Sequence, residues 1–261
     1  VAEFLGTLIL TLTGCGAAVI TGGVDGALGI LGIALTFGLV LTAMSYTIGD
    51  VSGCHINPAV TLAMFIDGRM GLGDFIFYFI SQILGGFAGA GILYIILICS
   101  DADTDSLWAN GYGDLSYAGI NLGGAIAVEV ILTLIFVLTV LAVTARYEYI
   151  RQSGIIVGLA LTLVNIFGIP LTGAGVNPAR SLGPAVFTGI DAIVQVWVFV
   201  AAPLVGAVIA AFLYRFLILQ RDDEYYEETE ESPEAEEAEE EDLGMEELEE
   251  EVEEELEDFE E

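Results

Sequence analysis

The feature that most constrains this chain is a series of long stretches without a charged residue. They cover residues 4–24, 26–49, 75–100, 152–179 and 192–214. A helix needs about 20 apolar residues to cross the hydrocarbon core of a bilayer, and several of these stretches reach that length. A soluble domain would not hold so many of them. The sequence therefore predicts an integral membrane protein.

Charge is distributed unevenly along the 261 residues. The formal net charge is −32, and 26 of the 38 acidic residues lie within 222–261. We expect residues 1–221 to form the membrane domain. Residues 222–261 are expected to be a disordered acidic tail, because like charges repel one another and leave no core to bury. Alternatively, an apolar stripe at helical spacing allows a tail helix that docks on a partner: Leu248, Val252, Leu256 and Phe259.

Six segments fit spanning helices, and two apolar segments are too short to span. The expected spanning helices are 2–22, 30–49, 74–99, 122–144, 154–168 and 192–219. The short segments, 57–66 and 177–187, would each cover roughly 15 Å, about half of a bilayer core. We therefore expect an all-α membrane protein with six transmembrane helices and two re-entrant half-helices.

The two halves, about 1–99 and 122–219, repeat one another. "AEFLGTLILT" from Ala2 matches "AVEVILTLIF" from Ala127, and Asn-Pro-Ala occurs at Asn57 and again at Asn177. Each half has three expected spanning helices, an odd number, so the halves enter the membrane from opposite sides. The sequence predicts an inverted repeat with a pseudo-two-fold axis in the membrane plane.

The basic residues predict the orientation. Apart from Arg180, they fall in the second, fourth and last connections between helices: Arg69, Arg146, Arg151, Arg215 and Arg221. The connections near 21–29 and 100–121 carry acidic residues and no basic ones. Because cytoplasmic loops are enriched in Lys and Arg, both termini are expected to be cytoplasmic.

Each short segment begins with the same motif: Asn57, Pro58 and Ala59, then Asn177, Pro178 and Ala179. Asn is a favoured N-cap, and Pro fits the first helical position. The inverted repeat would bring both N-termini together near the midplane, each with roughly half a positive charge. If the Asn NH₂ groups point into a lumen, a passing water must accept hydrogen bonds from them. That orientation breaks the chain of hydrogen bonds along which a proton would move.

The backbone before each motif is expected to be irregular. Non-helical backbone at membrane depth must be buried in protein or line a water-filled cavity. We expect this of "DVSGCHI" (50–56) and "GIPLTGAGV" (168–176), with carbonyl groups forming a ladder of acceptors along a pore.

Arg180 is the third residue after Asn177. A cation near a helix N-terminus is electrostatically unfavourable. An arginine inside the membrane is also costly, so a functional role is the default hypothesis for it. We expect Arg180 to be a donor and positive gate at an outer constriction. The alternative is that it ties loop carbonyls together.

The motifs "SGCHINPAV" and "TGAGVNPARSLGPA" resemble those of the aquaporins, the major intrinsic protein family, and the resemblance covers about residues 2–219. It implies a homotetramer with a pore in each subunit. It also implies an outer filter at four positions: Phe37, Asn165, Ala174 and Arg180. Asn165 stands where water-selective members usually carry His, and this smaller side chain leaves room for a wider constriction.

Other positions compared with the family favour water. Ser181 and Ala185 follow the second motif as in water channels, where glycerol facilitators typically carry Asp and a basic residue. Phe199 matches the water-channel aromatic, whereas Val200 stands where Trp is usual.

Three titratable residues are expected to support the re-entrant loops. Glu3 and Glu129 lie at matching places in apolar helices, which favours acceptance of loop N–H groups over a proton relay. For His55 we expect packing and a hydrogen bond to nearby backbone, and its pKa near 6.5 when unperturbed leaves pH sensing as the alternative.

These observations predict a passive water channel in the cell membrane that excludes protons and ions. The alternatives are a channel that also passes glycerol or other small neutral solutes, and a secondary transporter, which would need coupling-ion sites. With one His in the chain, no catalytic constellation and no metal-ligand cluster in the sequence, we expect no enzymatic activity, cofactor, metal or nucleic-acid partner.

Overall fold

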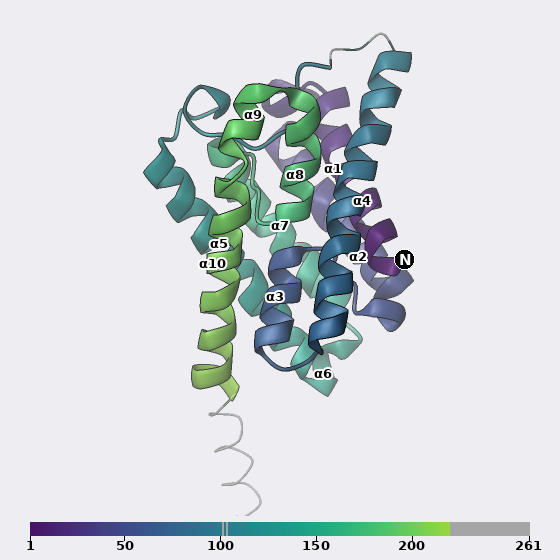
Figure 1. Cartoon of the computed structure of the whole chain (residues 1–261), viewed down its shortest axis with the longest axis vertical. Coiled ribbons are helices and arrows are strands. Elements are labelled where there is room, and N and C mark those ends of the chain that lie inside the picture. The colour runs from purple at the N-terminus through teal and green to yellow at the C-terminus, as the bar shows by residue number, and fades with distance from the viewer. Residues whose placement is uncertain (101, 103, 220–261) are drawn as a thin grey trace, which may run out of the picture. The chain divides into compact units, whose positions relative to one another are not determined.

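The computed structural model describes residues 1–100, 102 and 104–219. Every regular element in this part of the chain is helical (Figure 1). Among the described residues, six spans are long and apolar enough to cross a membrane, which confirms the predicted fold class. They are α1 (Ala2–Ile20), α2 (Gly29–Ser52), α4 (Leu72–Cys99), α5 (Leu122–Ala145), α7 (Ser153–Thr172) and the span Ile190–Phe216.

The remaining elements are short. The half-helices are α3 (Pro58–Ile66) and α8 (Pro178–Thr188). The others are the 3₁₀ turns η1 (Gly23–Asp25) and η2 (Gly113–Leu115), α6 (Tyr147–Ile150) and the π-helical η3 (Tyr214–Leu219). The expectations for the acidic tail, residues 222–261, lie outside the described part of the chain.

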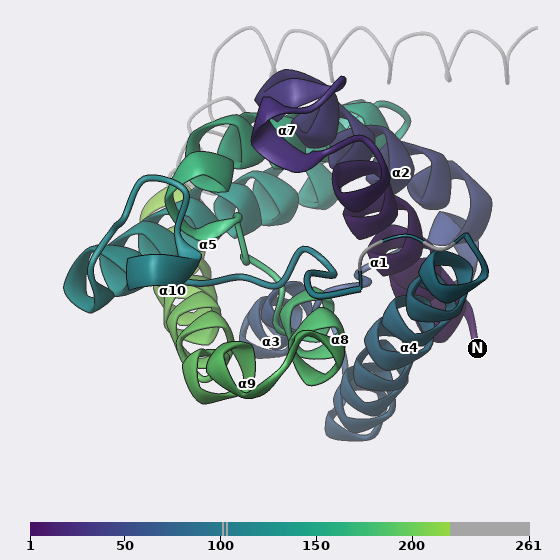
Figure 2. The same ribbon diagram turned by 90° about the horizontal axis from the view of Figure 1, so that it is seen from above.

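The half-helices lie end to end in the interior of the bundle. In Figure 1, α8 lies directly above α3, and both lie between α4 and the last long helix, α10 (Val198–Leu213). Each half-helix contacts both α4 and α10. Seen from above, α3 and α8 again lie between α10 and α4 (Figure 2). This arrangement brings the starts of the two half-helices together.

Glycines allow the two halves to approach closely where α2 crosses α7. A Cβ added to Gly38 would overlap Thr162 Oγ1 and the Gly158 carbonyl oxygen. A Cβ on Gly158 would overlap Thr42 Oγ1 and come within 2.6 Å of the Gly38 carbonyl oxygen. The two contacts have the same form with the halves exchanged, as the inverted repeat predicts.

Two helices run further toward the motifs than predicted. Residues 50–52 belong to α2 and residues 168–172 to α7, so the expectation of irregular backbone there is wrong. Each helix continues to a glycine with positive φ, Gly53 (φ 75°) or Gly173 (φ 79°), which closes its last turn. Pro170 is accommodated inside α7. Within the stretches 50–56 and 168–176, the irregular residues are 53–56 and 173–176.

The last predicted helix, 192–219, is also not continuous. It begins as α9 (Ile190–Gln195), is interrupted at Val196 and Trp197, and resumes as α10. At the end of α9, the side-chain oxygen Oε1 of Gln195 accepts a hydrogen bond from the backbone N–H of Tyr112 at 2.7 Å. The α9–α10 span is thereby joined to the connection between α4 and α5.

Candidate functional site

Asn57 and Asn177 cap the two half-helices. The oxygen Oδ1 of Asn57 accepts from the N–H of Ala59 at 2.9 Å. Oδ1 of Asn177 accepts from the N–H groups of Ala179 and Arg180 at 3.1 and 3.2 Å. Pro58 and Pro178 occupy the first helical position of α3 and α8. The sequence folds this way because the Asn side chain supplies an acceptor for the first N–H groups of the helix. Pro lacks a backbone N–H, which would have no partner within the helix at this position.

The two caps also bind each other's loops. Nδ2 of Asn57 donates to the Val176 carbonyl oxygen at 2.9 Å, and Nδ2 of Asn177 donates to the Ile56 carbonyl oxygen at 2.9 Å. We expected both N–H groups of each amide to point into a lumen. Instead, one N–H of each amide donates to the loop of the other half, which leaves one N–H per asparagine for another acceptor.

The loops before the caps share one backbone conformation. In the first loop φ is 51° at Cys54 and 40° at Ile56, and in the second it is 50° at Ala174 and 43° at Val176. Non-glycine residues rarely adopt positive φ, and such strain persists only where the surroundings impose it. Four such residues in two matching loops require strong local support.

Glu3 and Glu129 supply that support. Glu3 accepts from the backbone N–H groups of His55 and Ile56 at 3.0 and 2.6 Å. Glu129 accepts from those of Gly175 and Val176 at 2.9 and 2.8 Å. Hydroxyl groups of Ser52 and Thr172 add one bond to Glu3 and Glu129, respectively, each at 2.7 Å. This is the geometry expected of a carboxylate that holds a re-entrant loop.

A narrow cavity runs beside the two caps. Six of its lining residues are the predicted cap and filter residues Phe37, Asn57, Asn165, Ala174, Asn177 and Arg180. It offers about 20 Å³ in which a water-sized sphere can be centred. An ordered water needs roughly 10–15 Å³ by this measure, so the cavity has room for one or two water molecules. The structure thus gathers the four filter positions and both caps around one narrow space.

Arg180 is buried in the wall of this cavity, with 2 % of its surface exposed. Its Nη1 donates to Asn110 Oδ1 at 2.7 Å, and its Cζ lies 5.2 Å from the centroid of the Phe37 ring. Among the described residues, Nε and Nη2 have no hydrogen-bond partner. The bond to Asn110 thus holds the guanidinium in the cavity wall.

The match to a family model agrees with this geometry. The model described as "Major intrinsic protein" matches residues 1–214. The chain belongs to the major intrinsic protein family. The match includes both half-helices and every residue that lines the narrow cavity.

The relatives within the major intrinsic protein family include bacterial proteins named Aquaporin Z. The one from Brucella melitensis is 41% identical over 219 residues, which are 83% of this chain and 96% of the relative. The one from Rhodopseudomonas palustris is 42% identical over 83% of this chain and 91% of the relative. The X-ray structure of the aquaglyceroporin from Plasmodium falciparum has a TM-score of 0.74 at 27% identity, covering 85% of this chain and 96% of that one.

His55 takes part in a polar cluster that this family comparison does not explain. Its Nδ1 lies 3.2 Å from Thr61 Oγ1, and its ring meets Tyr78 edge-on at 5.3 Å. The expected hydrogen bond from the side chain to backbone is therefore replaced by one to a hydroxyl. Gln82 Nε2 donates both to Thr61 Oγ1 at 2.8 Å and to Glu3 at 2.7 Å.

Sequence reasoning missed Gln82 and Asn110. A polar residue within the uncharged stretch 75–100 was a usable signal for Gln82. Asn110 lies between α4 and α5, where nothing in the sequence marks it. It accepts from Arg180 and donates from Nδ2 to the Thr172 carbonyl oxygen at 3.1 Å.

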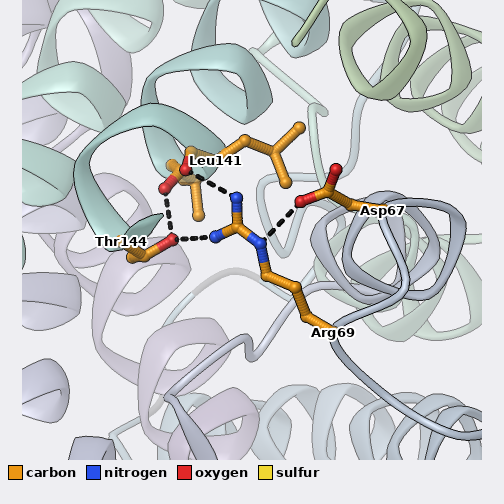
Figure 3. A network of polar contacts seen from close by, with 5 residues as sticks. Asp67, Arg69, Leu141 and Thr144 are labelled. Atoms are coloured by element: carbon orange, nitrogen blue, oxygen red, sulfur yellow. Dashed lines mark hydrogen bonds and ion pairs between the residues drawn. The ribbon is translucent and has the colours of Figure 1, made fainter. Parts of the chain in front are cut away.

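A second, wider cavity of about 670 Å³ adjoins the narrow one, and His55 lines both. Arg69 is one of its lining residues, and Figure 3 shows the polar contacts that its guanidinium makes. Its guanidinium donates to Asp67 at 2.6 Å, to Thr144 Oγ1 at 2.9 Å and to the Leu141 carbonyl oxygen at 3.0 Å. Arg69 thereby joins the segment after α3 to the end of α5, and so links the two halves of this family member.

Proposed function

We propose that this protein is a passive channel for water that excludes protons and cations. The observation that carries the proposal is the pair of asparagine caps, Asn57 and Asn177, at the meeting point of two helix N-termini beside a cavity with room for one or two water molecules.

The capping bonds decide what a permeating molecule meets. Each Oδ1 is already an acceptor for its own half-helix, so the function that each side chain still offers is an N–H donor. A water between them must accept from both and turn its own O–H groups away along the pore. Neighbouring waters then point in opposite directions, and a proton cannot hop past this point.

Electrostatics strengthens the exclusion of cations. Each half-helix carries roughly half a positive charge at its N-terminus, and the cross-bonds at 2.9 Å hold both ends at the same depth. Arg180 adds a full positive charge at the cavity. A neutral molecule crosses these fields at little cost, whereas a cation must leave its hydration shell against repulsion.

The similarity to proteins named Aquaporin Z supports water as the main substrate. One observation favours a second candidate, a channel that also passes glycerol. Asn165 is smaller than the His that the family resemblance leads us to expect, and one solved structure of similar fold is that of an aquaglyceroporin.

The proposal extends to assembly and location. By family resemblance we propose a homotetramer in the cell membrane. Both termini are proposed to be cytoplasmic, because the basic residues gather in the connections on that side.

The test is stopped-flow light scattering of proteoliposomes. Under a gradient of an impermeant solute, liposomes with the protein should shrink much faster than empty ones, and an equal rate would contradict the proposal. Under a glycerol gradient, fast re-swelling would favour the second candidate.

A further inference from the structure

The two loop carboxylates accept hydrogen bonds in the same pattern, with one exception. On each carboxylate, Oε1 accepts from one hydroxyl group and one loop N–H. Oε2 accepts from the next loop N–H, which is that of Ile56 for Glu3 and that of Val176 for Glu129. Oε2 of Glu3 also accepts from Gln82 Nε2 at 2.7 Å. Among the described residues, no donor takes this fourth place on Glu129.

Helix α4 crosses α1 in the same way as α10 crosses α5. A Cβ added to Gly85 of α4 would overlap the carbonyl oxygen of Phe4, and one added to Gly206 of α10 would come within 2.5 Å of the carbonyl oxygen of Val130. Phe4 and Val130 directly follow the two buried glutamates in the sequence. The two crossings are therefore equivalent, and they fix which residues of α4 and α10 correspond.

The residue of α10 that corresponds to Gln82 is a proline. Gln82 lies three residues before the crossing glycine of α4, and Pro203 lies three residues before that of α10. A proline side chain has no amide and cannot donate to Glu129. It also lacks a backbone N–H for the carbonyl oxygen of Phe199, four residues earlier. The second half thus lacks the NH₂ group that Gln82 supplies in the first.

Two buried hydroxyl groups in the second half have no partner. Ser181 corresponds to Thr61, because each is the fourth residue after the cap of its half-helix. Thr61 Oγ1 accepts from Gln82 Nε2 at 2.8 Å, whereas the fully buried Ser181 Oγ has no hydrogen-bond partner among the described residues. The same holds for Thr133 Oγ1 on α5. Buried polar groups are nearly always bonded to protein or to ordered water.

We propose that one ordered water molecule is bound between α5, α8 and α10, where it takes the place of the Gln82 amide. Like the amide nitrogen, it has two hydrogens to donate, one to Glu129 Oε2 and one to Ser181 Oγ. Its oxygen accepts from Thr133, which lies one turn after Glu129 and faces α10, since a Cβ on Gly206 would lie 3.0 Å from the Thr133 Cβ. A buried water typically makes about three hydrogen bonds, and these groups supply them.

This water is a structural component of the second loop and not a permeating molecule. Glu129, Ser181 and Thr133 are not among the described residues that line the narrow cavity. The water supplies the fourth hydrogen bond to the carboxylate that holds Gly175 and Val176, so its role is to position the loop. Its binding does not depend on the proposed channel function, and a protein that conducted no water would still contain it.

A crystal structure of the wild-type protein, at a resolution that shows ordered water, tests this site. We expect density for a water within hydrogen-bond distance of Glu129 Oε2 and Ser181 Oγ. The first half of the same map is the control, because the Gln82 amide occupies the equivalent place there. A map that shows other buried waters but none at this site would overturn the proposal, and so would a side chain that fills the site.

Two variants exchange the arrangements of the two halves. Pro203→Gln supplies the amide, so its crystal structure should lose the water and show an amide nitrogen bonded to Glu129. Gln82→Ala removes the amide from the first half, which should then gain a water between Glu3 and Thr61. A water that persists in Pro203→Gln, or a first half without water in Gln82→Ala, would contradict the proposal.

Thermal unfolding in detergent gives a readout that needs no crystals. Ser181→Ala removes one partner of the water, so the apparent melting temperature should fall by about 2–4 °C, as expected for the loss of roughly one hydrogen bond. A buried hydroxyl with no water to bond would instead be a cost to the folded state, and its removal would stabilise the protein. An unchanged or raised melting temperature in Ser181→Ala would therefore count against the bound water.

Discussion

At the scale of single residues, Glu129 is the clearest example of sequence chemistry determining local structure. It is a fully buried carboxylate on an apolar helix, and it accepts from two backbone N–H groups and one hydroxyl. Without it, Gly175 and Val176 would carry buried donors with no partner. Strained backbone such as Val176 (φ 43°) persists only because these bonds require it.

Replacing Glu129 with Ala should therefore destabilise the protein strongly. Each buried donor left unpaired costs roughly 1–3 kcal/mol, so the apparent melting temperature in detergent should drop substantially. Glu129→Gln retains an amide oxygen that can accept and should lose less. Equal melting temperatures for wild type and Glu129→Ala would show that the carboxylate does not hold the loop.

Cys54 supports a second prediction at this scale. It lines the wide cavity and lies in the first loop. A thiol reagent that enters this cavity should slow water permeation by adding bulk beside the pore. Cys54→Ala should be resistant, and it should fold because Ala174 holds the matching position with φ 50°.

The control for that experiment is Cys99→Ala, which removes an exposed cysteine at the end of α4. This variant should remain sensitive to the reagent. If Cys54→Ala is inhibited as strongly as wild type, the reagent acts elsewhere and Cys54 does not lie on the permeation path.

An interaction of the site could be predicted where a local pattern in the sequence indicates it. The caps at Asn57 and Asn177 follow from Asn-Pro, and Glu3 and Glu129 follow from the repeat. Asn110 binds Arg180 across 70 residues of sequence. That contact depends on the path of the α4–α5 connection, for which the sequence carries no periodic signal.

At the scale of helices, close packing determines at which positions the two halves of the repeat carry the same residue. α2 and α7 cross at Gly38 and Gly158, where any side chain would overlap backbone. The predicted helix ends, at residues 49 and 168, were too early; a glycine stands at each of these positions. In the structure both are helical, and each helix continues to a glycine with positive φ, Gly53 or Gly173.

Gly38 and Gly49, on the same helix, make a matched pair for a test. Gly38→Ala should destabilise by about 1–3 kcal/mol through overpacking. Gly49→Ala meets nothing within 4 Å and should stabilise slightly, because Ala costs less conformational entropy in a helix. Thermal unfolding in detergent measures both, and similar effects from the two changes would contradict the proposed crossing.

At the scale of the whole membrane domain, symmetry and asymmetry have separate roles. The inverted repeat gives matching loops, caps and carboxylates, and it brings two helix N-termini together. Asymmetry enters through Arg180 and Asn165 at the narrow cavity, and through the cluster of Gln82, Thr61 and His55 beside the first loop. We infer that the symmetric part blocks protons and the asymmetric part selects solutes.

The most direct test of the central claim measures water and proton flux in the same proteoliposomes. An osmotic gradient gives water permeability, and a pH gradient with the membrane potential clamped gives proton flux, reported by an enclosed pH-sensitive dye. The account predicts water permeability far above that of empty liposomes with proton flux no higher than theirs. Proton flux that rises together with water flux would contradict it.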